Sequence, residues 1–326
     1  MRIALVVDIR SEYHEADAKQ RLPTLERCLA RCDSIETASH GMQGCLLGDF
    51  GIMPDDAPLA ALSLAGEGGD PGSNYWLRAD PICLQPTLHR LAGRSMKADE
   101  LDWHEARARA AVIAPHLYTD GCELRVEHPV RWYLRCPPQR IRTRPLPTAL
   151  IPLDEALMPA GPDAGYWQRT MTEAQMLFHS ADLDGAREAS GRASVNGIWC
   201  WGGGSIDTPP SQTYTDVISD DVLALGLARL SGAVTAPLPD DAHAMIAELR
   251  DAPERRLLIA ISADRDLPLA TLESKWLAPL ASLVGDGLAD RLDLRLLLGS
   301  RGIGRRITRK SLRRWWRRTR PFIAHA

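Results

Sequence analysis

The apolar run at residues 3–7 (IALVV) constrains the fold more than any other segment of the chain. A short run without polar residues is typical of a strand that is buried on both faces, as in a parallel sheet. A helical pattern follows at residues 22–32, and Pro23 stands near its start, where a helix tolerates proline. The first part of the chain therefore predicts a strand and a helix of an α/β unit.

The part of the chain from residue 195 onward repeats this alternation. It predicts strands at residues 195–201, 216–219, 257–262 and 292–298, and helices at residues 222–230 and 269–283. Pro279 should kink or shorten the second of these helices. Because both ends of the chain alternate in this way, the simplest architecture is an α/β core with a mainly parallel sheet and helices on both faces.

The middle of the chain has a different pattern. It predicts, in order, a helix, the two strands of a hairpin and a second helix, at residues 99–116, 122–126, 130–136 and 171–188. A helix followed by a hairpin suggests a small α+β unit. We therefore expect a discontinuous core of residues 1–92 and 191–326, with an α+β domain inserted at residues 93–190.

Charge is distributed unevenly along the chain. The 326 residues include 39 Lys+Arg and 42 Asp+Glu, which gives a formal charge of −3. Residues 301–320 hold ten of the basic side chains and no acidic one, so the remaining 29 basic and 42 acidic residues carry −13. A composition with 45% hydrophobic and 25% charged residues excludes a disordered chain and a disulfide-stabilised miniprotein.

The basic end contains Trp315 and Trp316 between two pairs of arginines. Arginine and aromatic side chains together bind phosphate backbones and stack on bases, so a nucleic acid or an acidic protein is a candidate partner of residues 301–320. An anionic membrane surface is a further candidate. The alternative is that this segment folds against the acidic body with both indole rings buried.

The cysteines and the apolar runs bear on the location of the protein. Seven cysteines without a CxxC pair favour buried, reduced thiols and a cytoplasmic protein. The first apolar run ends at Asp8, too early for a signal peptide. No stretch approaches the roughly 20 apolar residues that cross a bilayer, so no membrane span is expected.

The sharpest local motif is Trp201-Gly202-Gly203-Gly204 at the end of a predicted strand. Three glycines allow a ligand to approach the backbone closely, and the N–H groups of such a turn can bind phosphate. The motif lacks the lysine of a Walker A loop and the spacing of a GxGxxG fingerprint. The alternative is a tight bend from strand to loop.

Other signatures of catalysis are weak. The sequence has no GxSxG motif, and none of its nine histidines has a second histidine within ten residues on either side. We therefore expect no local metal site and no cofactor. His179 has the most suggestive surroundings of the nine histidines.

Residues 177–187, Gly191 and residues 195–204 resemble archaeal-type cofactor-independent phosphoglycerate mutases. The shared features are a histidine at His179, an arginine at Arg187, and a strand end of the form Asn-x-Ile-Trp-x-Trp-Gly-x-Gly that begins at Asn196.

The resemblance continues weakly on both sides of these segments. Asp8, at the end of the first predicted strand, is similar to the family's metal-binding aspartate. Arg78 and Arg131 fall where the strand arginines of the family lie.

A bacterial family, often described as regulatory proteins of the RpfE type or as phosphoglycerate mutases, is more similar still. The likeness rests on residues 76–81 (WLRADP), residues 173–177 (EAQML), the WGGG motif and the Trp/Arg-rich end. It covers nearly the whole chain.

These resemblances imply the alkaline-phosphatase superfamily: a parallel α/β core, an inserted domain, two divalent metals and a serine nucleophile. The chain departs from that active site. The expected nucleophile turn corresponds to residues 41–45 (GMQGC), which lack a hydroxyl group, and residues 263–266 and 299–301 lack the expected histidines. Only Asp8 of the metal ligands is retained.

The leading hypothesis is therefore a phosphoglycerate-mutase-like regulatory protein that binds an anion and lacks mutase activity. Arg78, Arg131, Arg187 and Asn196 are the candidates for holding a phosphorylated or carboxylate metabolite, because arginine forks suit such anions. Their alternative role is to form ion pairs with the acidic body. The competing hypotheses are an active mutase or phosphatase, and a nucleic-acid or protein-binding module that uses the basic end.

Overall fold

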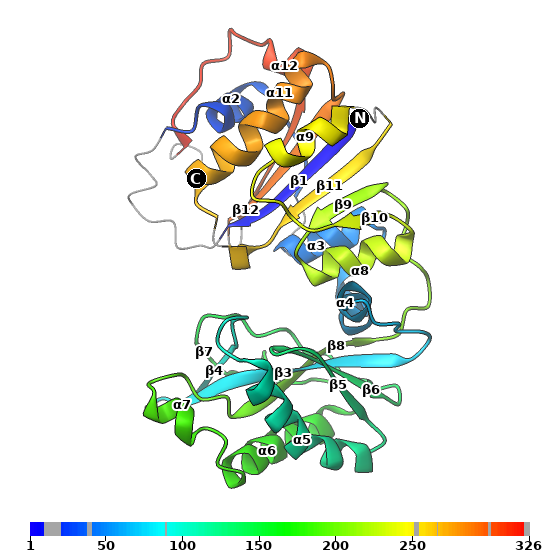
Figure 1. Cartoon of the computed structure of the whole chain (residues 1–326), viewed down its shortest axis with the longest axis vertical. Coiled ribbons are helices and arrows are strands. Elements are labelled where there is room, and N and C mark those ends of the chain that lie inside the picture. Colours follow the sequence, from blue (N-terminus) through cyan, green and yellow to red (C-terminus); the bar gives the residue numbers. More distant parts are fainter. Residues whose placement is uncertain are drawn as a thin grey trace. The chain divides into compact units, whose positions relative to one another are not determined.

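The computed structural model describes residues 1–9, 21–37, 41–88, 90–250, 254–265, 267–298 and 301–322. Its chain forms two compact units (Figure 1). The first unit combines Met1–Asp55 with Pro209–Ala326, and the second unit is the continuous segment Asp56–Thr208. The second unit is therefore an insertion into the first.

The first unit is built on a seven-stranded sheet in the order β10-β9-β11-β1-β12-β13-β2. The central strand β1 (Arg2–Ile9) pairs in parallel with β11 (Arg256–Ile261) and with β12 (Arg291–Leu298). β9 (Asp216–Ser219) and β10 (Val234–Ala236) extend the parallel part. The mainly parallel α/β sheet predicted from the two ends of the chain is confirmed.

The basic end of the chain forms the antiparallel part of this sheet. β13 (Arg301–Thr308) pairs with β12 and with the two-residue strand β2 (Asp33–Ser34). The sequence pattern did not predict β13, because Ile303 and Ile307 are its only apolar residues besides two glycines. The helix α12 (Arg309–Leu312) follows, with a capping box between Thr308 and Ser311 at its start.

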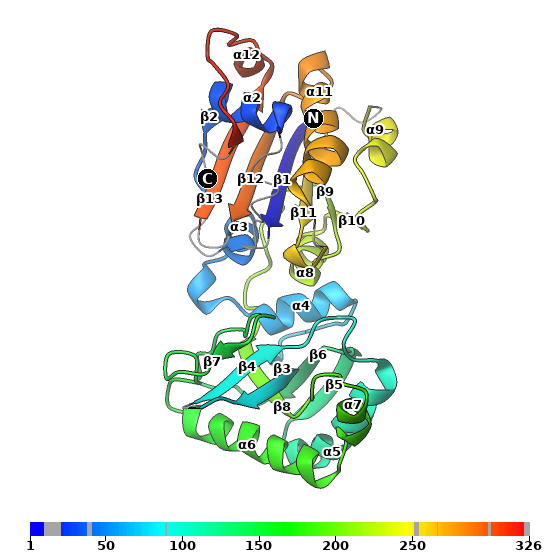
Figure 2. The same cartoon turned by 90° about the vertical axis from the view of Figure 1, so that its left-hand side faces the viewer.

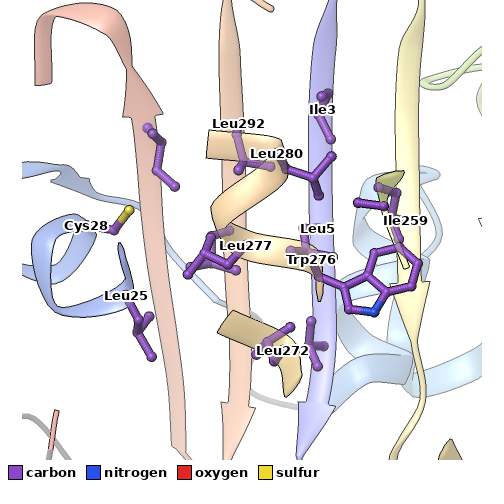
Figure 3. Packing of buried hydrophobic residues seen from close by; sticks show 14 of the residues in the cluster. Ile3, Leu5, Leu25, Cys28, Ile259, Leu272, Trp276, Leu277, Leu280 and Leu292 are labelled. Atoms are coloured by element: carbon purple, nitrogen blue, oxygen red, sulfur yellow. The ribbon is translucent and has the colours of Figure 1, made fainter. Parts of the chain in front are cut away.

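One face of the sheet packs against α2 (Pro23–Arg31), the helical segment η3 (Leu272–Leu277) and α11 (Ala278–Asp286). Ile3 and Leu5, alternate residues of β1, pack in one cluster with Trp276 and Leu280, and none of the four is more than 2% exposed (Figure 3). Alternation along the strand therefore assigns one set of side chains to this core.

The helix around Pro279 is altered in the way its proline predicts. A short α10 (Leu269–Thr271) leads into η3, whose hydrogen bonds are those of a π-helix, and Pro279 stands in the first turn of α11. Proline there does not need an N–H donor. Among its described residues, this unit also contains α3 (Gly41–Asp49) and α8 (Val222–Ser231), which contact β1 and β9 respectively, α9 (His243–Arg250) and the turn η2 (Ala263–Arg265). The turn η1 (Pro54–Asp56) stands at the junction between the two units.

The second unit contains an antiparallel sheet in the order β5-β6-β3-β4-β7, with β8 paired to β3. Its strands are β3 (Tyr75–Pro86), β4 (Leu91–Ser95), β5 (Glu123–His128), β6 (Arg131–Cys136), β7 (Ile151–Pro152) and β8 (Gly197–Gly204). In Figure 2, α5 (Trp103–Thr119) and α6 (Ala164–Ser180) cover one face, and α4 (Leu59–Glu67) covers the other. The short helix α7 (Gly185–Ala189) precedes β8.

The boundaries of the inserted unit differ from those expected. The predicted junctions at 92/93 and 190/191 assign β3, β8 and the first two residues of β4 to the core, whereas the contacts place all three strands in the second unit. The reason is the antiparallel pairing of β3 with β8 over Trp76–Gly204 to Ile82–Gly197. A strand pattern in a sequence identifies the strand but does not identify its partner.

Two smaller expectations concern the thiols and the membrane. The seven cysteines are all buried and free, as predicted. In the described part of the chain, no helix has the length and apolar character needed to cross a membrane.

Candidate functional site

In open α/β sheets, ligands bind beyond the carboxyl ends of the parallel strands. At this edge Asp8 lies near the end of β1, Asp221 follows β9, and Asp264 follows β11. Burial raises the pKa of Asp8, and the negative charges of Asp264 and Asp221 raise it further. The topology of the sheet therefore brings together three carboxylates that are distant in the sequence, and only Asp8 had been predicted as part of a site.

These carboxylates also have structural tasks. Asp221 accepts a hydrogen bond of 2.9 Å from the Ala224 N–H and caps α8. The buried Ser219 hydroxyl donates to the Ala260 carbonyl oxygen and accepts from the Asp221 N–H. Over the described ranges, no group of three or more His, Cys, Asp or Glu side chains could hold a metal ion. The donor set described at this edge thus does not fit the two-metal site that the resemblance implies.

The expected nucleophile turn is a helix. α3 begins at Gly41, and Cys45 lies inside it with 2% of its surface exposed. Residues 38–40, which precede this helix, and residues 10–20, 266 and 299–300, which follow strands of the sheet, lie outside the described residues. The buried thiol at Cys45 has no access to a substrate.

Arg78 is the centre of a closed cluster in the second unit. Its Nε and Nη2 atoms each donate to the Asp80 carboxylate at 2.9 Å, and its guanidinium carbon lies 4.9 Å from the Tyr133 ring and 5.1 Å from the Trp201 ring. Asp80 also accepts from the Trp201 indole N–H at 2.8 Å and from the Trp132 N–H at 3.2 Å. The charges of Arg78 and Asp80 neutralise each other within the cluster. Arg78 therefore has its alternative role, an ion pair within the chain.

The other predicted arginines are likewise engaged by carboxylates of the chain. Arg131 donates to Glu67. Arg187, which is 1% exposed, donates to Glu105 at 2.7 Å and to the carbonyl oxygens of Ala193 and Glu100. These contacts leave little donor capacity for a ligand.

The two remaining polar candidates do not join these arginines. The Asn196 side chain accepts from the Leu84 N–H at 2.8 Å and donates to the Leu84 carbonyl oxygen at 2.9 Å. His179 is exposed near the end of α6. The structure therefore brings together Arg78 and Trp201, with Arg131 nearby through Glu67 and Tyr133, whereas Arg187, Asn196 and His179 make their contacts elsewhere in the second unit.

The three glycines of the WGGG motif have a packing role. A Cβ atom on Gly203 would lie 2.2 Å from the Tyr75 hydroxyl, and one on Gly204 would lie 2.7 Å from Pro58 Cβ. Gly202 has a φ of +69°, which favours glycine. All three glycines lie within β8, where the register with β3 shifts, so the motif is a closely packed irregular strand end and not the expected bend from strand to loop.

The basic end is partly paired and partly free in solvent. Arg306 binds Asp293 at 2.8 and 3.1 Å, and Arg314 donates to the Arg31 carbonyl oxygen and to Asp33. In contrast, Trp315 is 78% exposed and Trp316 is 64% exposed, with their rings in an edge-to-face pair. The expected alternative with both indole rings buried is therefore wrong.

The exposed indoles lie between two buried residues of the first unit. Ser311 is fully buried before the tryptophans, and Phe322 is 2% exposed after them, within the core of the first unit. Between these anchors lie four exposed arginines, Arg313, Arg317, Arg318 and Arg320. The sequence did not predict that Phe322 anchors this segment. The only signal was a single aromatic residue after a run of basic residues, which is too weak to predict burial.

Comparisons with known proteins identify the fold but no family. No protein-family model matches the sequence, and no curated protein sequence matches it. The structure of the PH0037 protein from Pyrococcus horikoshii aligns with a TM-score of 0.54 and 10% identity, over 94% of this chain and 85% of that chain. The cofactor-independent phosphoglycerate mutase from Thermoplasma acidophilum DSM 1728 aligns with a TM-score of 0.49 and 17% identity, over 100% of this chain and 94% of that chain. At such identities, the likeness to the PH0037 protein concerns the fold alone.

Proposed function

We propose that this chain is a binding protein on a phosphoglycerate-mutase-like fold, without mutase activity, and that residues 313–320 engage a polyanionic partner. The observation that carries the proposal is the exposed Trp315–Trp316 pair, flanked by exposed arginines and anchored at both ends. The regulatory role suggested by the resemblance would then consist of this binding.

The proposed lack of mutase activity is supported by the chemistry that a phosphoserine mechanism requires. Such a mechanism needs an alcohol nucleophile and positive charge on the non-bridging oxygens of the transferred phosphoryl group. Cys45 is a buried thiol within α3, and Arg78 and Arg187 already bind Asp80 and Glu105. Neither requirement is met by these residues.

Single-stranded nucleic acid is the partner that this segment suits best. The arginines supply attraction to phosphates, and the exposed faces of the indole rings supply stacking surfaces for bases. An acidic protein would use the arginines but would not need two solvent-exposed indoles. Because both ends of the segment are anchored, little conformational entropy is lost when it binds.

Fluorescence anisotropy with a labelled single-stranded oligonucleotide tests the proposal. Arg317→Glu/Arg318→Glu should weaken binding by tenfold or more, and Trp315→Ala/Trp316→Ala should weaken it by about 5- to 100-fold per stacked base. Arg142→Glu/Arg144→Glu, which reverses two exposed arginines of the second unit, is the matched control. An acidic peptide that binds in place of the oligonucleotide would identify a protein partner and reject the nucleic-acid proposal.

The second candidate function is a metal-dependent mutase or phosphatase. The observation that favours it is electrostatic: the negative charges of Asp221 and Asp264 raise the pKa of Asp8 at the carboxyl edge, and negative charge there attracts cations, even though the described residues form no group that could hold a metal ion. A mutase and phosphatase assay with and without Mn²⁺ decides between the two functions. Turnover that requires the metal and is lost in Asp8→Asn would reject our proposal.

A further inference from the structure

A second basic site lies at the opposite end of the same sheet. A pocket of about 550 Å³ in the first unit is lined by residues at the amino ends of three parallel strands, Arg2 in β1, Arg256 in β11 and Arg291 in β12. Asp8 and the other carboxylates follow the carboxyl ends of these strands. The pocket is therefore separate from the edge where the resemblance places catalysis, and separate from residues 313–320.

The pocket lies on the face of the sheet away from the apolar core of Figure 3. Ile3 and Leu5 point into that core, so the intervening Ala4 faces the pocket side, where α3 supplies Asp49. On β12 the same alternation places Asp293 and Arg295 on this side, between core residues such as Leu294. A strand with apolar surroundings on both faces would not carry charged residues at positions 293 and 295.

The charges that line the pocket do not balance. Five arginines face two aspartates. Asp49 accepts from Arg295 at 2.8 Å and from the Tyr214 hydroxyl at 2.7 Å. Asp293 is shared by Arg306 and Arg291, at 2.8 and 3.4 Å.

Two arginines are left over after this pairing. In the part of the chain that the structure describes, no carboxylate forms a salt bridge with Arg2 or Arg256, and both side chains are exposed. Thr213 and Gln212 add neutral donors beside them. The paired aspartates hold the other guanidinium groups in place, which leaves a net positive pocket with oriented N–H donors.

We propose that this pocket binds a small molecule with at least two anionic groups, phosphate or carboxylate. Arginine forks recognise both groups by paired hydrogen bonds, and the volume lies within the range of small-molecule sites, about 300–1,000 Å³. The proposal goes beyond the polyanion-binding segment and does not depend on it.

Isothermal titration calorimetry of the full chain tests the site with inorganic pyrophosphate and with citrate as probes. We expect saturable binding of one molecule per chain, and the tighter probe shows whether phosphates or carboxylates are the natural groups. Arg2→Gln/Arg256→Gln should weaken binding of that probe by tenfold or more. Both side chains are exposed, so the variant should keep the melting temperature of the native protein.

The control Arg27→Gln/Arg309→Gln removes two exposed charges from the same unit outside the pocket and should leave probe affinity unchanged. Arg317→Glu/Arg318→Glu should also leave it unchanged, which separates this site from the basic segment. The proposal is overturned if neither probe binds saturably, or if the control weakens binding as much as the pocket variant does.

Discussion

Arg78 and Asp80 face each other from alternate positions of β3, joined by two hydrogen bonds of 2.9 Å between guanidinium and carboxylate. Only 4% of Arg78 and 7% of Asp80 is exposed. A charge pair that is buried and satisfied in this way belongs to the architecture of the second unit. Because Asp80 already occupies the Arg78 guanidinium, Arg78 need not bind a ligand even though it falls where the phosphoglycerate mutases have an arginine.

Asp80→Ala tests this structural role. The substitution leaves the Arg78 charge buried without its partner, which should lower the free energy of unfolding by about 3–5 kcal/mol. Glu123→Ala, which removes the half-exposed partner of Arg135, is the control and should cost less than about 1 kcal/mol. Urea unfolding measures both, and equal losses in the two variants would contradict the buried-pair account.

The WGGG motif makes a steric prediction. Gly203→Ala would place a Cβ atom 2.2 Å from the Tyr75 hydroxyl and 2.8 Å from Leu77 Cδ2, so it should destabilise the protein by about 1–3 kcal/mol. Gly48→Ala adds the same methyl group where no atom lies within 4 Å, and should be neutral or slightly stabilising. Thermal melts compare the two; a stable Gly203→Ala protein would argue against the packing role.

Asp8 makes a prediction about pH. Its pKa is raised by burial and by the charges of Asp264 and Asp221, so the folded state holds the proton more tightly than the unfolded chain does. The charged carboxylate therefore reduces stability above the raised pKa, and this loss disappears as the pH falls below the ordinary pKa of about 3.9.

Asp8→Asn should accordingly melt at a higher temperature than the native protein at pH 7. The difference in melting temperature between Asp8→Asn and the native protein should decrease as the pH falls through the raised pKa of Asp8. Melting curves between neutral and acidic pH follow this difference. A less stable Asp8→Asn at pH 7 would mean that a cation compensates the Asp8 charge, in favour of the metal-dependent alternative.

Much of the first unit could be predicted from the sequence. The apolar run that became β1 and the alternation that became β12 are local signals of burial, and they correctly indicated a mainly parallel sheet. The pairing of β3 with β8 could not be predicted, because strand partners are set by contacts between segments more than 100 residues apart. Because of that pairing, both observed junctions of the inserted unit differ from the predicted ones.

The candidate sites were less predictable than the fold. The sequence identified Arg78 and Arg187 as notable, but only the structure shows which carboxylates hold them. The proximity of Asp221 and Asp264 to Asp8 depends on the order of strands in the sheet. The sequence identified Trp315 and Trp316 as candidates for binding, but it did not show whether their rings are buried or exposed.

Phe322→Ala tests the anchoring of the basic end. Because the ring is 2% exposed in the core of the first unit, its removal should lower the free energy of unfolding by about 3–5 kcal/mol. Trp316→Ala removes a larger but 64% exposed ring and should change it by less than about 0.5 kcal/mol. A reversed order of these two effects would show that Trp316 is the anchor.

The dependence of oligonucleotide affinity on salt is the most direct test of the binding function. If Arg313, Arg317, Arg318 and Arg320 all contact phosphates, log affinity should fall against log salt with a slope of about −3, and Arg317→Glu/Arg318→Glu should reduce the slope to about half or less. The control Arg142→Glu/Arg144→Glu should keep the native slope. Affinity that does not depend on salt, or a slope that is the same in all three proteins, would contradict the assignment of residues 313–320 as the polyanion-binding segment.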